Sequence, residues 1–350
     1  MGQDVRFLAR SRHFAFGFLA AFFVIALAFI TAASNRIRLS PQFVPGLTLR
    51  YQIEMRTASQ GKTVTPIANP EGGSKFSQAV SMTVRLDVLS AATQSSSSAT
   101  QSGDADAAQS ARADGKANRF RVTYEKSHAH SESDAPVIQA HSSDDQYDRL
   151  EGHSIEFTAE PNGQLTNFQG LEGIVSSPSD AAPIFSWMDE LSVGSGFPRE
   201  GISVGQKWTG EKSLSGSPLA DLIWRTTSTY LRNESCAPPP DAAAAAAAKA
   251  GEDECAVILT RFEILRRGSA HSDATPDDYR RNGLRTSGAW TGSGETLDSI
   301  SLATGLLASS TQSSTQHMDY EIANAANGSS IHRTGDVQNQ VEIKLLPNSQ

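Results

Sequence analysis

A chain of 350 residues has room for one large or two ordinary domains, each with a buried core. Its composition, 38% apolar and 19% charged, is that of a globular protein rather than of a wholly disordered one. The net charge is −8, and residues 1–33 carry +2, which leaves −10 on the remainder. An acidic body without a run of Lys and Arg repels phosphate backbones, which argues against nucleic acid as a partner.

The N-terminal segment predicts export. A basic flank at residues 1–13 precedes an uncharged apolar run at 14–33. As a helix, this run covers the roughly 30 Å hydrocarbon core of a bilayer, so we expect a signal-anchor that crosses the cell membrane once. A signal peptide cleaved near Ala33 is the alternative, which would release a secreted or periplasmic protein. Both interpretations place residues 34–350 outside the cytoplasm, because the basic flank stays inside.

Cys236 and Cys255 bracket a Pro- and Ala-rich stretch, and each adjoins a β-rich run. If those runs form a hairpin, the two cysteines face one another at its mouth. An exported protein would then carry a disulfide that closes a loop of about 20 residues and stabilises the fold by about 3 kcal/mol. Two free buried thiols are the alternative, which suits a reducing compartment.

Alternation of apolar and polar residues dominates the chain and predicts antiparallel strands with one wet face. In the first, Leu49, Tyr51 and Ile53 alternate with polar residues. We expect a mainly β fold of one or more large twisted antiparallel sheets, arranged as a half-barrel or a sandwich. The expected strands are 47–57, 76–89, 119–128, a hairpin over 153–169, 207–214, 220–234, 255–265, a hairpin over 294–312, and 338–346.

One further helix is expected near 180–192. Ile184, Trp187, Met188 and Leu191 recur at i, i+3, i+4 and i+7, which places them on one side of a helix. No other segment outside 14–33 shows a helical period of comparable length.

The order of predicted strands repeats, which suggests a duplicated unit. The first half covers 34–175, and the second half, with the helix, covers 176–346. Low-complexity inserts at 91–118 and 237–254 fall between the second and third strands of their halves. Hairpin tips tolerate such inserts, which we expect to be disordered. Coincidence among many short strands is the alternative explanation.

The best candidate metal ligands are His128, His130 and His141. Two histidines at i and i+2 of a strand point the same way, and acidic residues follow up to His153. The competing interpretation is a polar, acidic loop whose histidines face water, and it is favoured because no Cys pair or His-x-x-x-His spacing supports a metal. No cofactor is expected.

Two short matches to catalytic motifs lack the required context. Residues 201–205 fit Gly-x-Ser-x-Gly, but that motif needs a helix after the serine, and a strand is predicted there. Residues 59–62 fit Ser-x-x-Lys, but they are predicted to lie in a polar loop rather than at a helix start. The four tryptophans are expected in the core, with Trp290, between glycines, the one expected to be accessible.

Two short segments resemble bacterial exported proteins of a family known as a domain of unknown function. They are Phe43-Val44-Pro45-Gly46-Leu47 and Val204-Gly205-Gln206-Lys207-Trp208, and the resemblance covers about residues 43–315. It implies an exported β-rich fold and no activity. The arrangement is also similar, more loosely, to the half-barrel lipoprotein carriers of the periplasm, which wrap a curved sheet around a helix to enclose an apolar cavity.

These observations favour a non-enzymatic binding or structural module of the cell envelope, whose partner is an apolar ligand or an envelope protein. A metal-assisted or other hydrolase that uses the His128–His153 segment is one alternative. A tethered scaffold whose hairpin tips contact envelope partners is another. An apolar cavity or patch would favour binding, whereas a cleft of titratable groups with shifted pKa values would favour catalysis.

Overall fold

The computed structural model describes residues 36–39, 41, 43–66, 73–92, 117–134, 140–160, 165–172, 174, 187–188, 197–198, 200–214, 217–236, 254–267 and 273–347. The expected membrane segment at 14–33 lies outside this set, as do most residues of both low-complexity inserts. Among the described residues, no helix is both long enough and apolar enough to cross a membrane.

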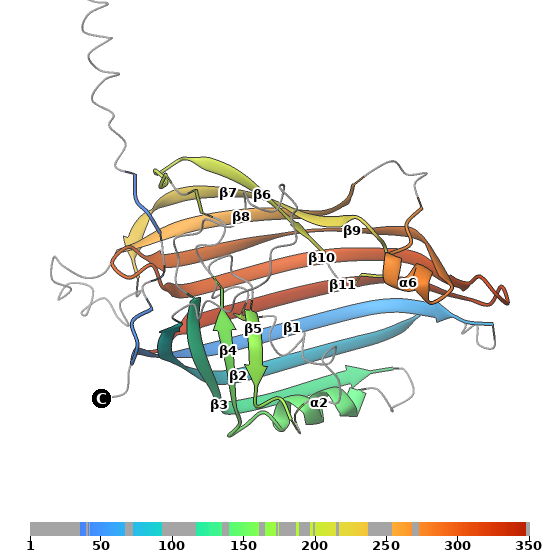
Figure 1. Ribbon diagram of the computed structural model, residues 1–350, viewed down its shortest axis with the longest axis horizontal. Helices are drawn as coiled ribbons and strands as arrows, with labels where there is room; N and C mark the ends of the chain where they lie inside the picture. Colours follow the sequence, from blue (N-terminus) through green and yellow to red (C-terminus); the bar gives the residue numbers. More distant parts are fainter. Residues whose placement is uncertain are drawn as a thin grey trace, which may run out of the picture.

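Within the described residues, all named strands belong to one eleven-stranded antiparallel sheet (Figure 1). This confirms the mainly β, antiparallel class and excludes the two-sheet sandwich for these residues. The order is β5-β4-β3-β2-β1-β11-β10-β9-β8-β7-β6. The strands are β1 Thr48–Val64, β2 Ser74–Ala92, β3 Ala117–Ser133, β4 Ser154–Ala159, β5 Leu165–Gln169, β6 Lys207–Ser213, β7 Leu222–Ser235, β8 Glu254–Arg266, β9 Leu284–Ser301, β10 Leu307–Asn324 and β11 Ser330–Leu345.

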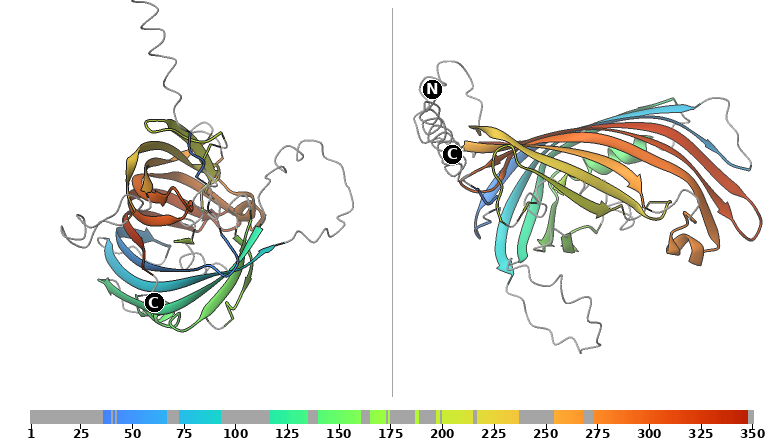
Figure 2. Two further views of the ribbon diagram at one scale, coloured as in Figure 1. Left: turned by 90° about the vertical axis from the view of Figure 1, so that its left-hand side faces the viewer. Right: turned by 90° about the horizontal axis from the view of Figure 1, so that it is seen from above.

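The sheet curls into an open half-barrel, as its end-on view shows (Figure 2, left). The strand order ends at β5 and β6, which do not pair with one another, so the barrel stays open along one side. We call the inward face of the curl the concave face. The core end is the end where β1 begins, and the wide end is the end where β1 finishes at Val64 (Figure 1, right).

The concave face is apolar at the core end, because the apolar residues of each strand alternate onto it. On β1, Leu49, Tyr51 and Ile53 are buried, whereas the intervening residues point outward. The register carries this face across the sheet, since Ile53 lies opposite Met82 on β2 and Ile343 on β11. All three are at most 1% exposed, and together with their neighbours they form the main hydrophobic core.

Toward the wide end the same face becomes polar and then apolar again. Next to the core lies a band that includes Thr57, Gln78 and Asn339. Beyond it, near β7 to β10, a second smaller cluster contains Leu222, Ile264 and Tyr320. The concave face is therefore amphipathic along the strands.

Two described helices were not predicted. They are α2, Ala140–Asp148, and α6, Asp277–Arg281. The predicted helix at 180–192 lies outside the described residues except for Trp187 and Met188. These two are 1% and 2% exposed and belong to the main core, as the period suggested.

Several strands are longer than predicted. β1 was expected to finish at 57 and β9 to begin at 294, but they reach Val64 and begin at Leu284. The extra residues are rich in Gly, Ser, Thr and Gln, so they show no apolar alternation, and pairing with neighbouring strands holds them extended instead. Glycines on β9 also make room for large neighbours: a Cβ at Gly294 would collide with the Phe262 ring.

The two halves of the chain have the same strand order and directions. Strands β1 to β5 follow one another across the sheet, and β6 to β10 do so in the same sense, with β11 between β1 and β10. The low-complexity inserts connect β2 to β3 and β7 to β8, which are corresponding positions. A duplicated unit requires this topology, and the duplication itself stays a prediction.

Cys236 and Cys255 lie at disulfide distance, with their Cα atoms 4.8 Å apart. Cys236 directly follows β7, and Cys255 is the second residue of β8, so the pair lies at the mouth of the β7–β8 hairpin as predicted. Cys255 is 0% exposed, so this end of the cross-link is buried.

We expect Cys236→Ser to lower the free energy of unfolding by about 3 kcal/mol, because the hairpin loses its cross-link in the unfolded chain. Chemical denaturation of the oxidised protein measures this. The wild-type protein in reducing buffer should have the same free energy of unfolding as the variant. Titration of two reactive thiols in oxidised native protein would show that the disulfide is absent.

Candidate ligand-binding face

Helix α2 covers the free edge of β3. Strand β4 pairs only with Asn118–Thr123 of β3, so the later backbone N–H groups have no strand on that side. Tyr147 and Leu150 are buried, which anchors α2 and the turn after it to the core. Burial also raises the pKa of Tyr147 to about 12. Asp144 and Asp148 of α2 hydrogen bond to the backbone of β3.

Three carboxylates accept the free N–H groups in succession. Ser127 N donates to Glu151 Oε2 at 3.3 Å, Ala129 N to Asp148 Oδ1 at 3.2 Å, and Ser131 N to Asp144 Oδ2 at 2.8 Å. Alternate residues of an edge strand point their N–H groups outward. Asp144 and Asp148 lie one helical turn apart, so their spacing on α2 matches the spacing of the Ser131 and Ala129 N–H groups on β3. The acidic segment therefore closes a sheet edge that would otherwise be free to pair with other chains.

This geometry corrects the predicted acidic loop, which is a helix. His128 Nδ1 lies 3.1 Å from Asp148 Oδ1, and His130 Nε2 lies 3.7 Å from Glu132, with both rings exposed. The side chain of His141 lies outside what the structure describes. Among the described residues no three His, Cys, Asp or Glu side chains come together in a way that could hold a metal ion.

Asp144→Ala should destabilise the protein by about 1–2 kcal/mol, because it leaves the Ser131 N–H without an acceptor. Asp145→Ala, an exposed neighbour on α2, is the matched control and should change the free energy of unfolding little. Equal effects of the two variants in chemical denaturation would show that capping of the edge contributes nothing.

Burial alone would raise the pKa of Asp144, but hydrogen bonds from Ser131 and Gln78 outweigh it and lower the pKa. The stability from Asp144 is therefore present at neutral pH. It is lost as pH falls below the ordinary carboxyl range through the lowered pKa. The difference in free energy of unfolding between wild type and Asp144→Ala should therefore decrease over that acidic range.

The two motif matches are not sites. Ser59 and Lys62 lie within β1, not in the predicted loop, and by strand alternation they point to opposite faces. Gly201–Gly205 is followed by a turn and then by β6 at Lys207, not by a helix. Neither serine has the helix start that its motif requires.

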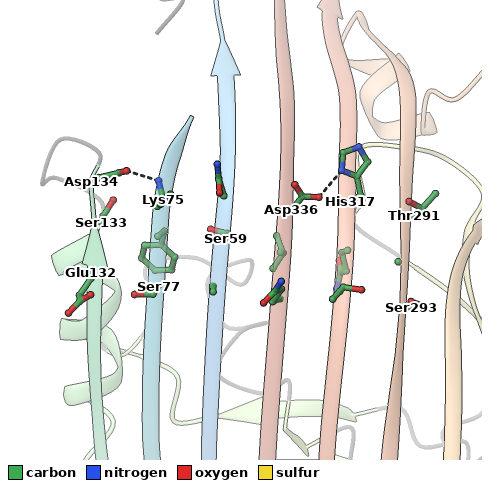
Figure 3. Close-up of a pocket in the computed structure, with 18 residues that line it drawn as sticks. Ser59, Lys75, Ser77, Glu132, Ser133, Asp134, Thr291, Ser293, His317 and Asp336 are labelled. Carbon is green, nitrogen blue, oxygen red and sulfur yellow. Dashed lines mark hydrogen bonds and ion pairs between the residues drawn. The ribbon is translucent and has the colours of Figure 1, made fainter. Parts of the chain in front are cut away.

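The outer face at the wide end is polar and open. A broad depression of about 1140 Å³ crosses six adjacent strands from β3 to β9 (Figure 3), and Phe76 and Val337, which the register places on the concave face, are among the residues that line it. Its outward side chains include Ser77, Thr291 and Ser293, and His317 Nδ1 lies 2.8 Å from Asp336 Oδ1. Both members of that pair are more than half exposed. The described residues of this depression leave it open to water, unlike the closed clefts of active sites.

The concave face of the wide end differs from the outer face because it carries apolar side chains that are only partly buried. Met55, Phe76, Val337, Trp290 and Met318 all lie on it by register, and all remain only half-buried. Residues on this face of the core end are fully buried. An incompletely covered apolar surface on a concave sheet is a place where a ligand can bind.

Trp290 is the aromatic centre of this surface. Its ring lies 6.4 Å from that of Tyr320 in a stacked arrangement, and its Nε1 donates to Gln316 Oε1 at 3.1 Å. Glycines at 288 and 292 flank it on the same face, so the ring has no bulky neighbour along β9. Trp187 is buried as expected, but Trp208 and Trp224 are half-buried like Trp290, so Trp290 is not the one accessible tryptophan.

Comparisons with known proteins do not extend this picture. No protein-family model and no curated protein matches the sequence. The outer membrane protein OprG from Pseudomonas aeruginosa is 7% identical, with a TM-score of 0.17, and the match covers 88% of this chain and 99% of that chain. A β-barrel-like protein of the domain of unknown function DUF1849 from Brucella abortus is 8% identical, with a TM-score of 0.16, covering 85% and 99%. TM-scores this low do not indicate a shared fold.

Proposed function

We propose that this protein is a non-enzymatic binding module of the cell envelope. It holds the apolar chain of an amphiphilic ligand on the concave face of its open half-barrel. The observation that carries this proposal is the half-buried state of Met55, Phe76, Val337 and Met318 on a face that is otherwise the core face of the sheet.

An amphiphile suits this face better than a wholly apolar molecule does. Polar residues such as Thr57, Gln78 and Asn339 interrupt the apolar surface, and Thr57 Oγ1 donates to Asn339 Oδ1 at 3.0 Å. A buried polar side chain tolerates a neighbour that can exchange hydrogen bonds with it, and a ligand with polar groups can do so.

A binding role also fits the ionisable groups. Glu156 owes its lowered pKa to hydrogen bonds from Arg121 and Arg119 in surface ion pairs, and Asp144 owes its lowered pKa to hydrogen bonds from Ser131 and Gln78. Burial raises the pKa of Tyr51 and Tyr124, which keeps both phenols neutral. These are structural arrangements rather than a set of groups converging in a cleft.

Val337→Asp should weaken the binding of decyl maltoside, a neutral amphiphile, by about tenfold or more, because it places a charge under the alkyl chain. Gln338→Asp is the matched control, since residue 338 is the next on β11 and points to the outer face. Calorimetric titration below the critical micelle concentration measures both. Equal affinities of the two variants for decyl maltoside would show that the concave face is not the binding surface.

We further propose that residues 34–350 lie outside the cytoplasm, anchored to the cell membrane by residues 14–33. The uncharged run after a basic flank supports this. The full-length chain should then remain in the membrane fraction after a carbonate wash. Recovery of a soluble species that begins at Ser34 would contradict the anchor and establish a cleaved signal peptide instead.

A further inference from the structure

A single carboxyl group lies on the concave face where the core end meets the polar band. Asp298 on β9 pairs with Ser310 on β10 and with Ile258 on β8. Ser310 and Ile258 are 2% and 1% exposed, and the next residue of this row, Ile343 on β11, is 0% exposed. The carboxyl group is thus surrounded mainly by branched apolar side chains.

Asp298 lacks the partners that a buried carboxylate requires. The Ser310 hydroxyl hydrogen bonds to the carboxyl group, but Oδ1 is inaccessible to solvent and has no hydrogen-bond partner among the described residues. An ionised carboxyl group without a counter-charge is costly in such surroundings. Burial accordingly raises the pKa of Asp298 to about 6, and the Ser310 hydrogen bond only partly opposes it.

No cation on the same face is near enough to compensate within the part of the chain that the structure describes. The basic residues whose register places them on this face are Lys212, Arg266 and Arg333. Lys212 is the nearest along the ladder, in the row of Gly292, six residues from Asp298 on β9. Six residues of a strand span about 20 Å.

Beside Asp298 the next row toward the wide end starts with Thr296 and Gln312, and it becomes apolar at Val341, two strands away. That row contains Val341 and Met55, both half-buried, and Val337 and Phe76 lie two rows further. An alkyl chain laid along these side chains would bring its head group to Asp298. The Asp298 carboxyl group therefore lies at one end of this apolar surface.

We propose that Asp298 is the anchor for the ammonium head group of a cationic, amine-bearing amphiphile whose alkyl chain lies along the concave face. The inference rests on the proposed function and specifies the ligand class. An ammonium group held beside the carboxyl group supplies the missing counter-charge. A sulfate or carboxylate head at the same place would meet a like charge instead.

The anchor makes binding dependent on pH. The tyrosines on the same face of the core end are Tyr230 on β7, Tyr51 on β1 and Tyr124 on β3, and burial raises the pKa of each. Glu254 at the start of β8 is a further acidic group at this end, since its charge also raises the pKa of Tyr230. The tyrosines stay neutral near pH 6, so they do not change charge over the range in which Asp298 does. The preference for a cation should be strong above pH 6 and decline as Asp298 becomes protonated.

The test compares decylamine, decyl maltoside and decyl sulfate, which share one chain length, by calorimetric titration of the full chain held in an amphipathic polymer. Wild type at pH 8 should prefer decylamine by about tenfold or more. Asp298→Asn should lose this preference and its pH dependence while keeping its affinity for decyl maltoside. Asp319→Asn on the outward side of β10 removes the same charge and should behave like wild type.

Each outcome separates the two claims. If none of the three amphiphiles binds wild type, both the proposed function and the anchor are wrong. If all three bind equally, or if Asp298→Asn and Asp319→Asn behave alike, the anchor is wrong and the binding face stands. Thermal unfolding at pH 8 checks the fold of Asp298→Asn, which should be at least as stable as wild type because a neutral amide avoids the desolvation of a charge.

Discussion

The pairing of β1 with β11 makes one sheet out of the two ends of the chain. The ladder runs from Tyr51 opposite Leu345 to Val64 opposite His332. Its register decides which face every strand beyond it presents, because a slip of one residue would turn all inward residues of β11 and its neighbours outward. The match of Ile53 with Ile343 within the core, and of Thr57 with Asn339 in the polar band, opposes such a slip.

The continuous concave face is a consequence of that ladder. Apolar residues of the first half, such as Met55 and Phe76, are brought beside Val337 and Val341 of the second half only because β1 and β11 are neighbours. The sheet nevertheless ends at β5 and β6 without closing. Along β3, an exposed edge could pair with other chains. There the carboxylates of α2 and of the turn after it accept hydrogen bonds from the free backbone N–H groups.

Alternation of apolar and polar residues was sufficient to predict the antiparallel class, the position of most strands and the cysteine pair. It failed where strands lack apolar residues, as in the second half of β1 and the first half of β9. Pairing across the sheet, which no local pattern records, extends those strands. Helix α2 was missed because its stabilising contacts are carboxylates that accept N–H groups from β3, and the sequence shows only an acidic stretch.

Asp298 shows why the candidate site was beyond prediction. Leu297 is apolar but points outward and is 38% exposed, whereas Asp298 points inward beside Ile258. Hydropathy alone would predict the opposite orientation of β9, with Leu297 on the concave face and Asp298 on the outer face. Only the pairing of Ile300 with the first residues of β10, and of Thr296 with Thr260 on β8, places the carboxyl group on the concave face. The sequence also gave no sign that a long stretch of that face would remain uncovered.

The most direct test of ligand binding on the concave face is quenching of tryptophan fluorescence by an amphiphile with a brominated alkyl chain. Variants that retain a single tryptophan report the position of the chain. Trp290 lies half-buried on the concave face at the wide end, and Trp187 lies buried in the main core. We predict saturable quenching of Trp290 and little quenching of Trp187. Absence of saturable Trp290 quenching, at concentrations where the amphiphile binds, would contradict the account.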